Sequence, residues 1–150
     1  MENFLIYMDN CCFNRPFDDL SDDKVRLESE SVLTIVERSD KKIWELCSSD
    51  ILFDEISRMD DPVRREKVLI LYASANVNIK MSDDIINRAK KLMQVNIKPF
   101  DALHIASAES INADVFLTTD KRLINASKRT NLSVRVLNPA IWIMEVLYND

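Results

Sequence analysis

Short apolar segments alternate with longer amphipathic segments along this whole chain. Residues 4–8, 114–118 and 132–137 are apolar runs of strand length, and residues 76–80 alternate weakly. Between them, apolar side chains recur three and four residues apart, which is typical of helices. Strands that alternate with helices predict an α/β fold with a mostly parallel sheet.

Most segment boundaries carry their own signals. We expect seven helices: 24–38, one from Ser49, one from Pro62, one from Ser82, one from about Pro99 to Ile111, 121–130, and one after Pro139. Residues 43–46 fit either a short strand or a helix end, and residues 10–23 are expected to be a polar loop. There is no internal repeat or low-complexity segment. We therefore expect residues 1–150 to form one domain.

The chain contains no glycine, so other residues must occupy positions that require a positive φ. Asparagine tolerates this region better than other residues. Asn96, Asn112 and Asn131 each follow a helical pattern, where a C-cap glycine usually lies. We expect these three to have a positive φ, although ordinary loop asparagines would look the same.

Composition excludes some protein classes and leaves others open. The 150 residues are 47% apolar and 30% charged, and no run approaches the roughly 20 apolar residues of a membrane span. The first apolar run lacks a preceding basic region, which argues against a signal peptide. Three cysteines without zinc-ligand spacing indicate reduced thiols in a cytoplasmic protein, serving in packing or at the surface.

Four carboxylates adjoin apolar segments spread over the chain. Asp9 and Asp120 close the runs at 4–8 and 114–118, and Glu55 and Asp101 lie on expected helices. Because parallel strands present their carboxyl ends at one edge, we expect the four to meet there. Such a group requires a cation, and Mg²⁺ and Mn²⁺ prefer oxygen ligands. The formal net charge of −5 does not decide against nucleic acid, because these four groups carry most of it.

Each carboxylate also has a purely structural interpretation. Asp9 and Asp120 fit turn or N-cap positions, Asp101 fits a capping residue at a helix start, and Glu55 fits the rim of a buried face. The acidic cluster at residues 18–23 lacks both the spacing and the glycine of a calcium loop.

Several other side chains are candidates for supporting roles. Asn10 and Thr118 adjoin the aspartates, and His104 follows Asp101 on the same helix face, although a lone histidine there is usually a hydrogen-bonded core residue. Phosphate-contacting candidates are basic residues near these segments, although a salt-bridged surface explains them equally well: Arg64, Arg65, Lys98, Lys121 and Arg122.

Taken together, the segments that hold these carboxylates resemble the PIN domain family of metal-dependent nucleases, which includes the VapC-type toxins. The resemblance covers nearly the whole chain and follows Tyr7-Met8-Asp9-Asn10, the loop of residues 14–19, residues 49–55, Lys98-Pro99-Phe100-Asp101-Ala102-Leu103-His104, and residues 113–120. Asn96 and Asn112 stand where the family often has glycine.

The resemblance implies a three-layer α/β/α sandwich and cleavage of single-stranded RNA, with Asp9, Glu55, Asp101 and Asp120 as the catalytic, metal-binding quartet. It also implies an antitoxin partner and a homodimer, while the composition predicts no membrane association. The alternative is a PIN-like module that binds RNA or protein without cutting. A receiver or phosphohydrolase domain fits less well, because the basic residues lie on helices and not at a strand end.

Overall fold

A five-stranded parallel sheet forms the centre of the computed structural model, which describes residues 3–148. The strand order is β3-β2-β1-β4-β5, and every neighbouring pair is parallel. The strands are β1 (Leu5–Met8), β2 (Glu45–Ser49), β3 (Val77–Ile79), β4 (Val115–Leu117) and β5 (Val136–Leu137). The undecided residues 43–46 therefore lead into a strand.

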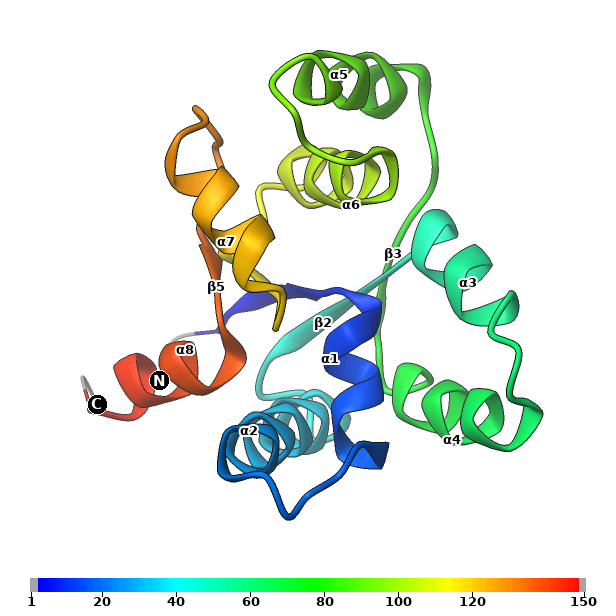
Figure 1. The fold of residues 1–150 in the computed structure, drawn as a ribbon, viewed down its shortest axis with the longest axis vertical. Helices are drawn as coiled ribbons and strands as arrows, with labels where there is room; N and C mark the ends of the chain where they lie inside the picture. The colour runs from blue at the N-terminus through cyan, green and yellow to red at the C-terminus, as the bar shows by residue number, and fades with distance from the viewer. Residues whose placement is uncertain (1–2, 149–150) are drawn as a thin grey trace.

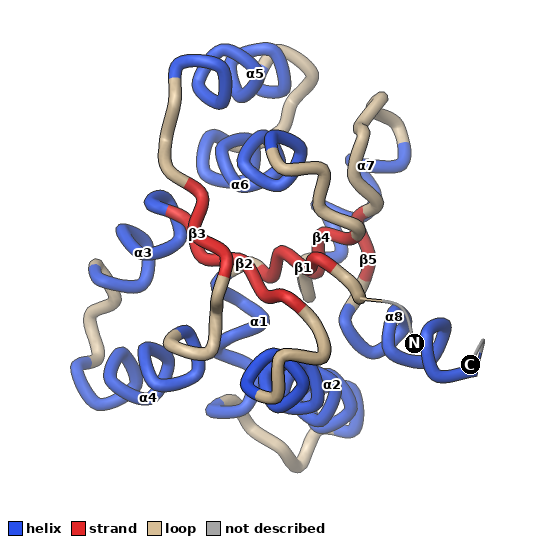
Figure 2. Tube along the Cα trace, turned by 180° about the vertical axis from the view of Figure 1, so that it is seen from behind, coloured by secondary structure: helices blue, strands red, loops and turns tan. Residues whose placement is uncertain are grey.

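Helices cover both faces of this sheet (Figure 1), and Figure 2 shows α5 and α6 on one face and α1, α2 and α4 on the other. The helices are α1 (Asn10–Asn14), α2 (Asp23–Asp40), α3 (Asp50–Ser57), α4 (Pro62–Tyr72), α5 (Asp83–Met93), α6 (Pro99–Ser110), α7 (Lys121–Lys128) and α8 (Pro139–Tyr148), with one 3₁₀ turn, η1 (Arg15–Phe17). The predicted three-layer α/β/α sandwich is confirmed.

The alternation of side chains along the strands divides the interior into two cores. Ile6 and Met8 pack in one core with residues of α1, α2, α4 and α8, whereas Tyr7 between them packs in the other. The second core joins Tyr7 and Phe116 to α5, α6 and α7, and the two rings stack with centroids 5.3 Å apart. β1 is therefore buried on both faces, as its uninterrupted apolar sequence indicates.

The chain reverses its direction of travel across the sheet at β1. It proceeds from β1 to β2 and β3 on one side, then returns to form β4 and β5 on the other. The amide of Asp9 donates to the carbonyl of Leu117 at 3.1 Å, so the ends of β1 and β4 lie side by side. Ligand crevices of open α/β sheets form at such a reversal point, beyond the carboxyl ends of the strands.

The expectation of a polar loop over residues 10–23 is wrong for its first half, which forms α1 and η1. Asp9 begins α1 by accepting from the amide of Cys12, and Cys12 and Phe13 are buried beneath it. Pro16 lies in the first turn of η1. The polar composition concealed a short helix whose two core residues, Cys12 and Phe13, stand next to each other in the sequence.

Two of the three expected glycine substitutes have a positive φ: Asn96 at 68° and Asn112 at 54°. The expectation is wrong for Asn131, whereas Lys42 has a positive φ of 59°. After α7, the amide of Arg129 bonds back to carbonyls of the last helical turn, so the chain leaves without a left-handed residue. After α2, the amide of Lys42 bonds to the carbonyl of Ser39 as the chain turns into β2.

Parts of the helical surface remain apolar. Leu27 and Leu33 on α2 and Val63 and Ile70 on α4 are exposed. Within residues 3–148, none of the helices combines the length and the apolar character that crossing a membrane requires.

A candidate metal centre at the carboxyl ends of β1 and β4

A cavity of about 420 Å³ opens beyond the ends of β1 and β4. All four predicted carboxylates line it, so the structure brings together residues that are up to 111 positions apart in the chain: Asp9, Glu55, Asp101 and Asp120. Asn10 and His104, two of the three predicted supporting residues, line the same cavity.

Asp9 and Asp120 reach the cavity from strand ends and also cap helices. Oδ1 of Asp9 accepts from the amide of Cys12 at 3.4 Å, and Oδ1 of Asp120 accepts from the amides of Arg122 and Leu123 at 2.9 and 3.3 Å. The structural interpretation of these two residues is therefore correct, and it is compatible with a position in the site because a carboxylate has two oxygens.

Glu55 and Asp101 reach the cavity from helices and cap nothing. Asp101 lies in the first turn of α6, whose N-cap, Lys98, makes no side-chain capping bond. Glu55 lies in the second turn of α3, where Ser49 is the cap. The capping interpretation is therefore wrong for Asp101, although the electrostatic field of the helix N-terminus still favours its negative charge.

Negative charge in the cavity is poorly compensated by the chain itself. Burial raises the pKa of Asp9 well above its ordinary value, and Cys11 and Asp101 raise it further. Burial also raises the pKa of Asp101; Asp120 and Glu55 add to this, while His104 acts in the opposite direction. The four carboxylates therefore repel one another, and a divalent cation with oxygen ligands fits this donor set.

A chain of buried hydrogen bonds holds Glu55. His104 Nε2 lies 3.2 Å from Glu55 Oε1, and His104 Nδ1 lies 2.6 Å from the hydroxyl of Tyr7. That hydroxyl lies 2.7 Å from Oγ of Ser49, which accepts from the amide of Leu52 at 3.1 Å. Burial raises the pKa of the Tyr7 phenol well above its ordinary value, so the phenol keeps its proton.

One direction of donation satisfies every group in this chain. The amide of Leu52 donates to Ser49, Ser49 donates to Tyr7, and Tyr7 donates to His104 Nδ1. In this arrangement the ring proton on His104 Nε2 is donated to Glu55. His104 is thus a buried, hydrogen-bonded histidine, which confirms that interpretation, and its contact with Glu55 is consistent with the supporting role, which stays a prediction.

The sequence reasoning missed three side chains at this site. The sequence identifies Tyr7 only as a strand residue, Ser49 only as part of a helix cap, and Cys11 only as a packing or surface thiol. The Cys11 thiol lies in the cavity and donates to Asp9 Oδ1 at 2.6 Å. The signal for Tyr7 was a phenol inside a strand buried on both faces, because a buried hydroxyl requires a partner. Sulfur atoms of Cys11 and Cys12 and a carboxylate oxygen of Asp9 lie within 4.8 Å of one another.

The remaining candidates differ in position. Thr118 is fully buried, and its Oγ1 accepts from the amide of Asp120 at 3.0 Å. Arg64 lines the cavity, whereas Arg65 donates to the carbonyl of Met59. Lys98 and Arg122 line an adjacent cavity, and Lys121 lines neither of the two.

Comparisons with known proteins agree with this architecture. The PIN domain model matches residues 18–129, and the chain therefore belongs to the PIN domain family. The match begins after Asp9, which joins the site through β1. None of the curated protein sequences compared with the chain matches it significantly.

Two solved structures have the same fold. A chain of VapBC2 from Rickettsia felis, solved with a DNA fragment from the promoter, has a TM-score of 0.60 and 17% identity, over 89% of this chain and 98% of that one. A chain of VapBC-1 from nontypeable Haemophilus influenzae has a TM-score of 0.55 and 16% identity, over 90% and 98%.

Proposed function

We propose that this protein is an endoribonuclease that uses Mg²⁺ or Mn²⁺ to hydrolyse phosphodiester bonds of single-stranded RNA. One observation carries the proposal: four carboxylates from four separate segments line a single cavity in a PIN domain. The raised pKa values of Asp9 and Asp101 support it, because burial and then neighbouring negative charge disfavour their ionised forms, and a bound cation would favour those forms.

Asp9, Glu55, Asp101 and Asp120 would hold the ion. When bound, Mg²⁺ or Mn²⁺ lowers the pKa of an attacking water and offsets the charge that develops on the phosphate. The chain supplies the positioning. Helix caps fix the strand-end aspartates, and His104 fixes one oxygen of Glu55. Thr118 fixes the backbone between β4 and Asp120 through its bond to the Asp120 amide.

We further propose that the protein acts as the toxin of a toxin–antitoxin pair, forms a homodimer and is bound by an antitoxin protein. The VapBC structures with the same fold support the pairing. Exposed apolar side chains on α2 and α4 support contacts with a second copy and with an antitoxin, because no other part of the described chain covers them. These side chains are Leu27, Leu33, Val63 and Ile70.

Removal of divalent ions tests the reaction. Purified protein should cleave a mixture of single-stranded RNAs in Mg²⁺ or Mn²⁺, lose this activity in excess EDTA, and regain it when Mg²⁺ is restored. A parallel preparation of Asp101→Asn controls for contaminating ribonuclease. Undiminished cleavage in EDTA would contradict the proposal, and metal binding by calorimetry without cleavage would favour a non-cutting module.

A further inference from the structure

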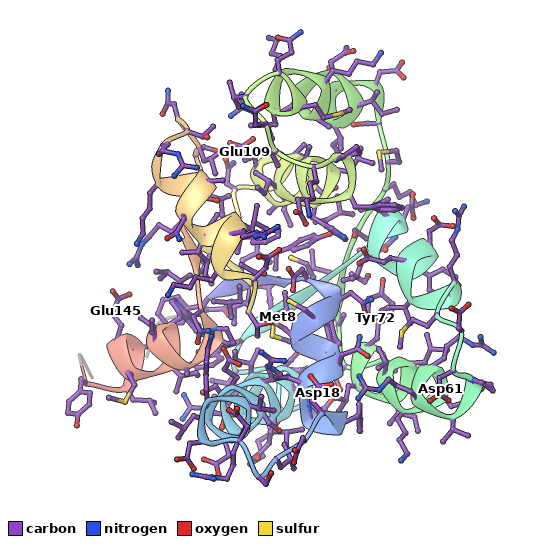
Figure 3. The ribbon with its side chains drawn as sticks, viewed as in Figure 1. Met8, Asp18, Asp61, Tyr72, Glu109 and Glu145 are labelled. Carbon is purple, nitrogen blue, oxygen red and sulfur yellow. The ribbon has the colours of Figure 1, made fainter. Side chains whose placement is uncertain are left out.

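Two of the four carboxylates also belong to a second cavity. Asp101 and Asp120 line both the carboxylate cavity and a neighbouring cavity of about 400 Å³. The second cavity lies between the start of α6 and the helix α7, two elements that Figure 3 shows beside each other. A ligand centred on the carboxylates can therefore extend across these two aspartates into it.

The cations on the two sides of the shared aspartates differ in their availability. On the α1 and α4 side, the Arg64 guanidinium donates to Asp18 Oδ1 at 2.8 Å and to Asn14 Oδ1 at 3.2 Å, and it also contacts the Phe17 carbonyl. Arg15 there donates to Glu28 at 2.8 Å and to Asp18 at 3.0 Å. Both arginines are thus already committed to partners within the protein.

On the α7 side, the cavity is lined by Lys98, Arg122 and Arg129. All three are exposed, and none of them forms a side-chain ion pair or hydrogen bond with another residue in the 3–148 range. We call Lys98, Arg122 and Arg129 the basic arm. These cations can bind a ligand without first breaking an internal contact.

The arrangement of α7 suits an extended polyanion. Arg122 lies in the first turn of α7 and Arg129 is its C-cap, so the length of the helix, about 10 Å along its axis, separates them. This span exceeds the spacing of successive phosphates along a strand. Between them, Asn125 lines the cavity with an amide that can donate or accept, while Leu123 anchors the helix in the core.

We propose that the basic arm binds the sugar–phosphate backbone of the RNA on one side of the bond that is cut, so that the strand runs over α7 and not across α1 and α4. The inference rests on the proposed ribonuclease function and assigns a direction to its substrate. It adds Arg129 to the candidate RNA contacts and leaves Arg64 and Arg65 out of this part of the path.

Binding measurements in a non-cleaving background test the path separately from the chemistry. In Asp9→Asn protein with Mg²⁺ present, fluorescence anisotropy would follow the affinity for a labelled 12-nucleotide RNA as NaCl is raised. Each phosphate contact that is lost should reduce the slope of log affinity against log salt by about 0.7 for a single strand. Arg122→Gln and Arg129→Gln should each show this reduction, and the double variant should lose about twice as much.

Lys128→Gln is the matched control. Lys128 is an exposed cation on the same helix and does not line the cavity, so its loss should leave the slope unchanged. Thermal melting of each variant would verify folding, which these exposed positions should not affect. An equal loss of slope in Lys128→Gln would overturn the proposal in favour of a general charge effect. A larger loss in Arg64→Gln than in Arg122→Gln would also overturn it.

Competition identifies the class of ligand. Unlabelled RNA should displace the labelled strand, whereas polyglutamate of equal charge should not; equal displacement would overturn the assignment to nucleic acid. The two proposals can fail separately. If the wild-type protein cleaves RNA but both arginine variants keep the wild-type salt slope of RNA affinity, only the proposed RNA path is refuted. If the arginine variants reduce that slope but the wild-type protein does not cleave RNA, only the ribonuclease function is refuted.

Discussion

The four carboxylates of the cavity form two pairs that differ in how the chain holds them. Asp9 and Asp120 follow adjacent strands and begin the helices that come next, so their side chains have backbone donors. Glu55 and Asp101 come from inside helices; Glu55 has His104 as its partner, and Asp101 is surrounded mainly by like charge. One pair thus caps helices as well as lining the cavity, whereas the other pair lines the cavity without capping a helix.

The largest expected effect separates function from stability at Asp101. Asp101→Asn keeps the shape of the side chain and removes one ligand charge, so RNA cleavage should fall by more than the roughly 100-fold that loss of an outer support costs a metal site. The thermal midpoint at pH 7 should stay level or rise. Burial first and Asp120 second raise the pKa of Asp101, so at a pH above this pKa its ionised form costs the folded protein stability, and the uncharged amide avoids that cost.

Cleavage assays and thermal melts of the same preparation check both parts. Glu109→Gln is a control on the same helix, because Glu109 is bound by Arg88 at 2.8 Å outside the cavity. That variant should lose stability and keep cleavage. A lower midpoint for Asp101→Asn than for Glu109→Gln would break the distinction between the two pairs.

A smaller effect should follow from loss of the Tyr7 hydroxyl. Tyr7→Phe preserves the ring that stacks on Phe116 and removes the donor to His104, so the orientation of the imidazole against Glu55 is no longer fixed. We expect a roughly 10-fold weaker affinity for Mn²⁺, which is typical for loss of an outer-shell partner. Calorimetric titration with Mn²⁺ measures this directly and does not depend on cleavage.

Tyr72→Phe provides the matched control for that measurement. The Tyr72 hydroxyl bonds to the backbone amide and carbonyl of Ser49, both at 3.2 Å, and among residues 3–148 no hydrogen bond joins it to His104. Its loss should cost stability alone, by about 1 kcal/mol for a hydrogen bond. Equal weakening of Mn²⁺ binding in the two variants would show that Tyr7 acts through general packing and not through His104.

The smallest effect concerns the structural role of Asp120. Asp120→Ala removes the cap of α7 and should destabilise the protein by about 1 kcal/mol, whereas Asp120→Asn, which can still cap, should lose only a fraction of this. Urea denaturation without divalent ions compares the two. Equal stabilities of Asp120→Ala and Asp120→Asn would mean that capping by Asp120 does not stabilise the fold, and that the strand-end aspartates then do not differ from Glu55 and Asp101 in this respect.

The carboxylates could be predicted from the sequence because two of them close apolar runs, and parallel strands bring such ends to one edge. Glu55 was harder to assign, since its position relative to Ile51, Leu52 and Ile56 fits a rim residue as well as a ligand. The hydrogen-bonded support could not be predicted. It joins Tyr7 on a strand, Ser49 at a helix cap and His104 inside a helix. The spacing of these three residues in the sequence does not indicate that their side chains meet.

A positive φ could be predicted from the sequence only where the residue is of a type, such as asparagine, that favours this conformation. Asn96 and Asn112 have the expected positive φ because each lies in the turn that follows a helix, where the chain changes direction. Lys42 has the same geometry against its own preference, since the path from α2 into β2 fixes it there. Helix α1 escaped prediction because its capping residue is also the end of a strand.

The pairing of β1 with β4 has a consequence for biosynthesis. Tyr7 lies opposite Phe116, so β1 acquires this neighbour only after the long segment between the two residues has been made. The four carboxylates come together later still, once Asp120 has emerged. Under the proposed ribonuclease function, this order of assembly would keep the nascent fragment inert beside the messenger and ribosomal RNA that surround it.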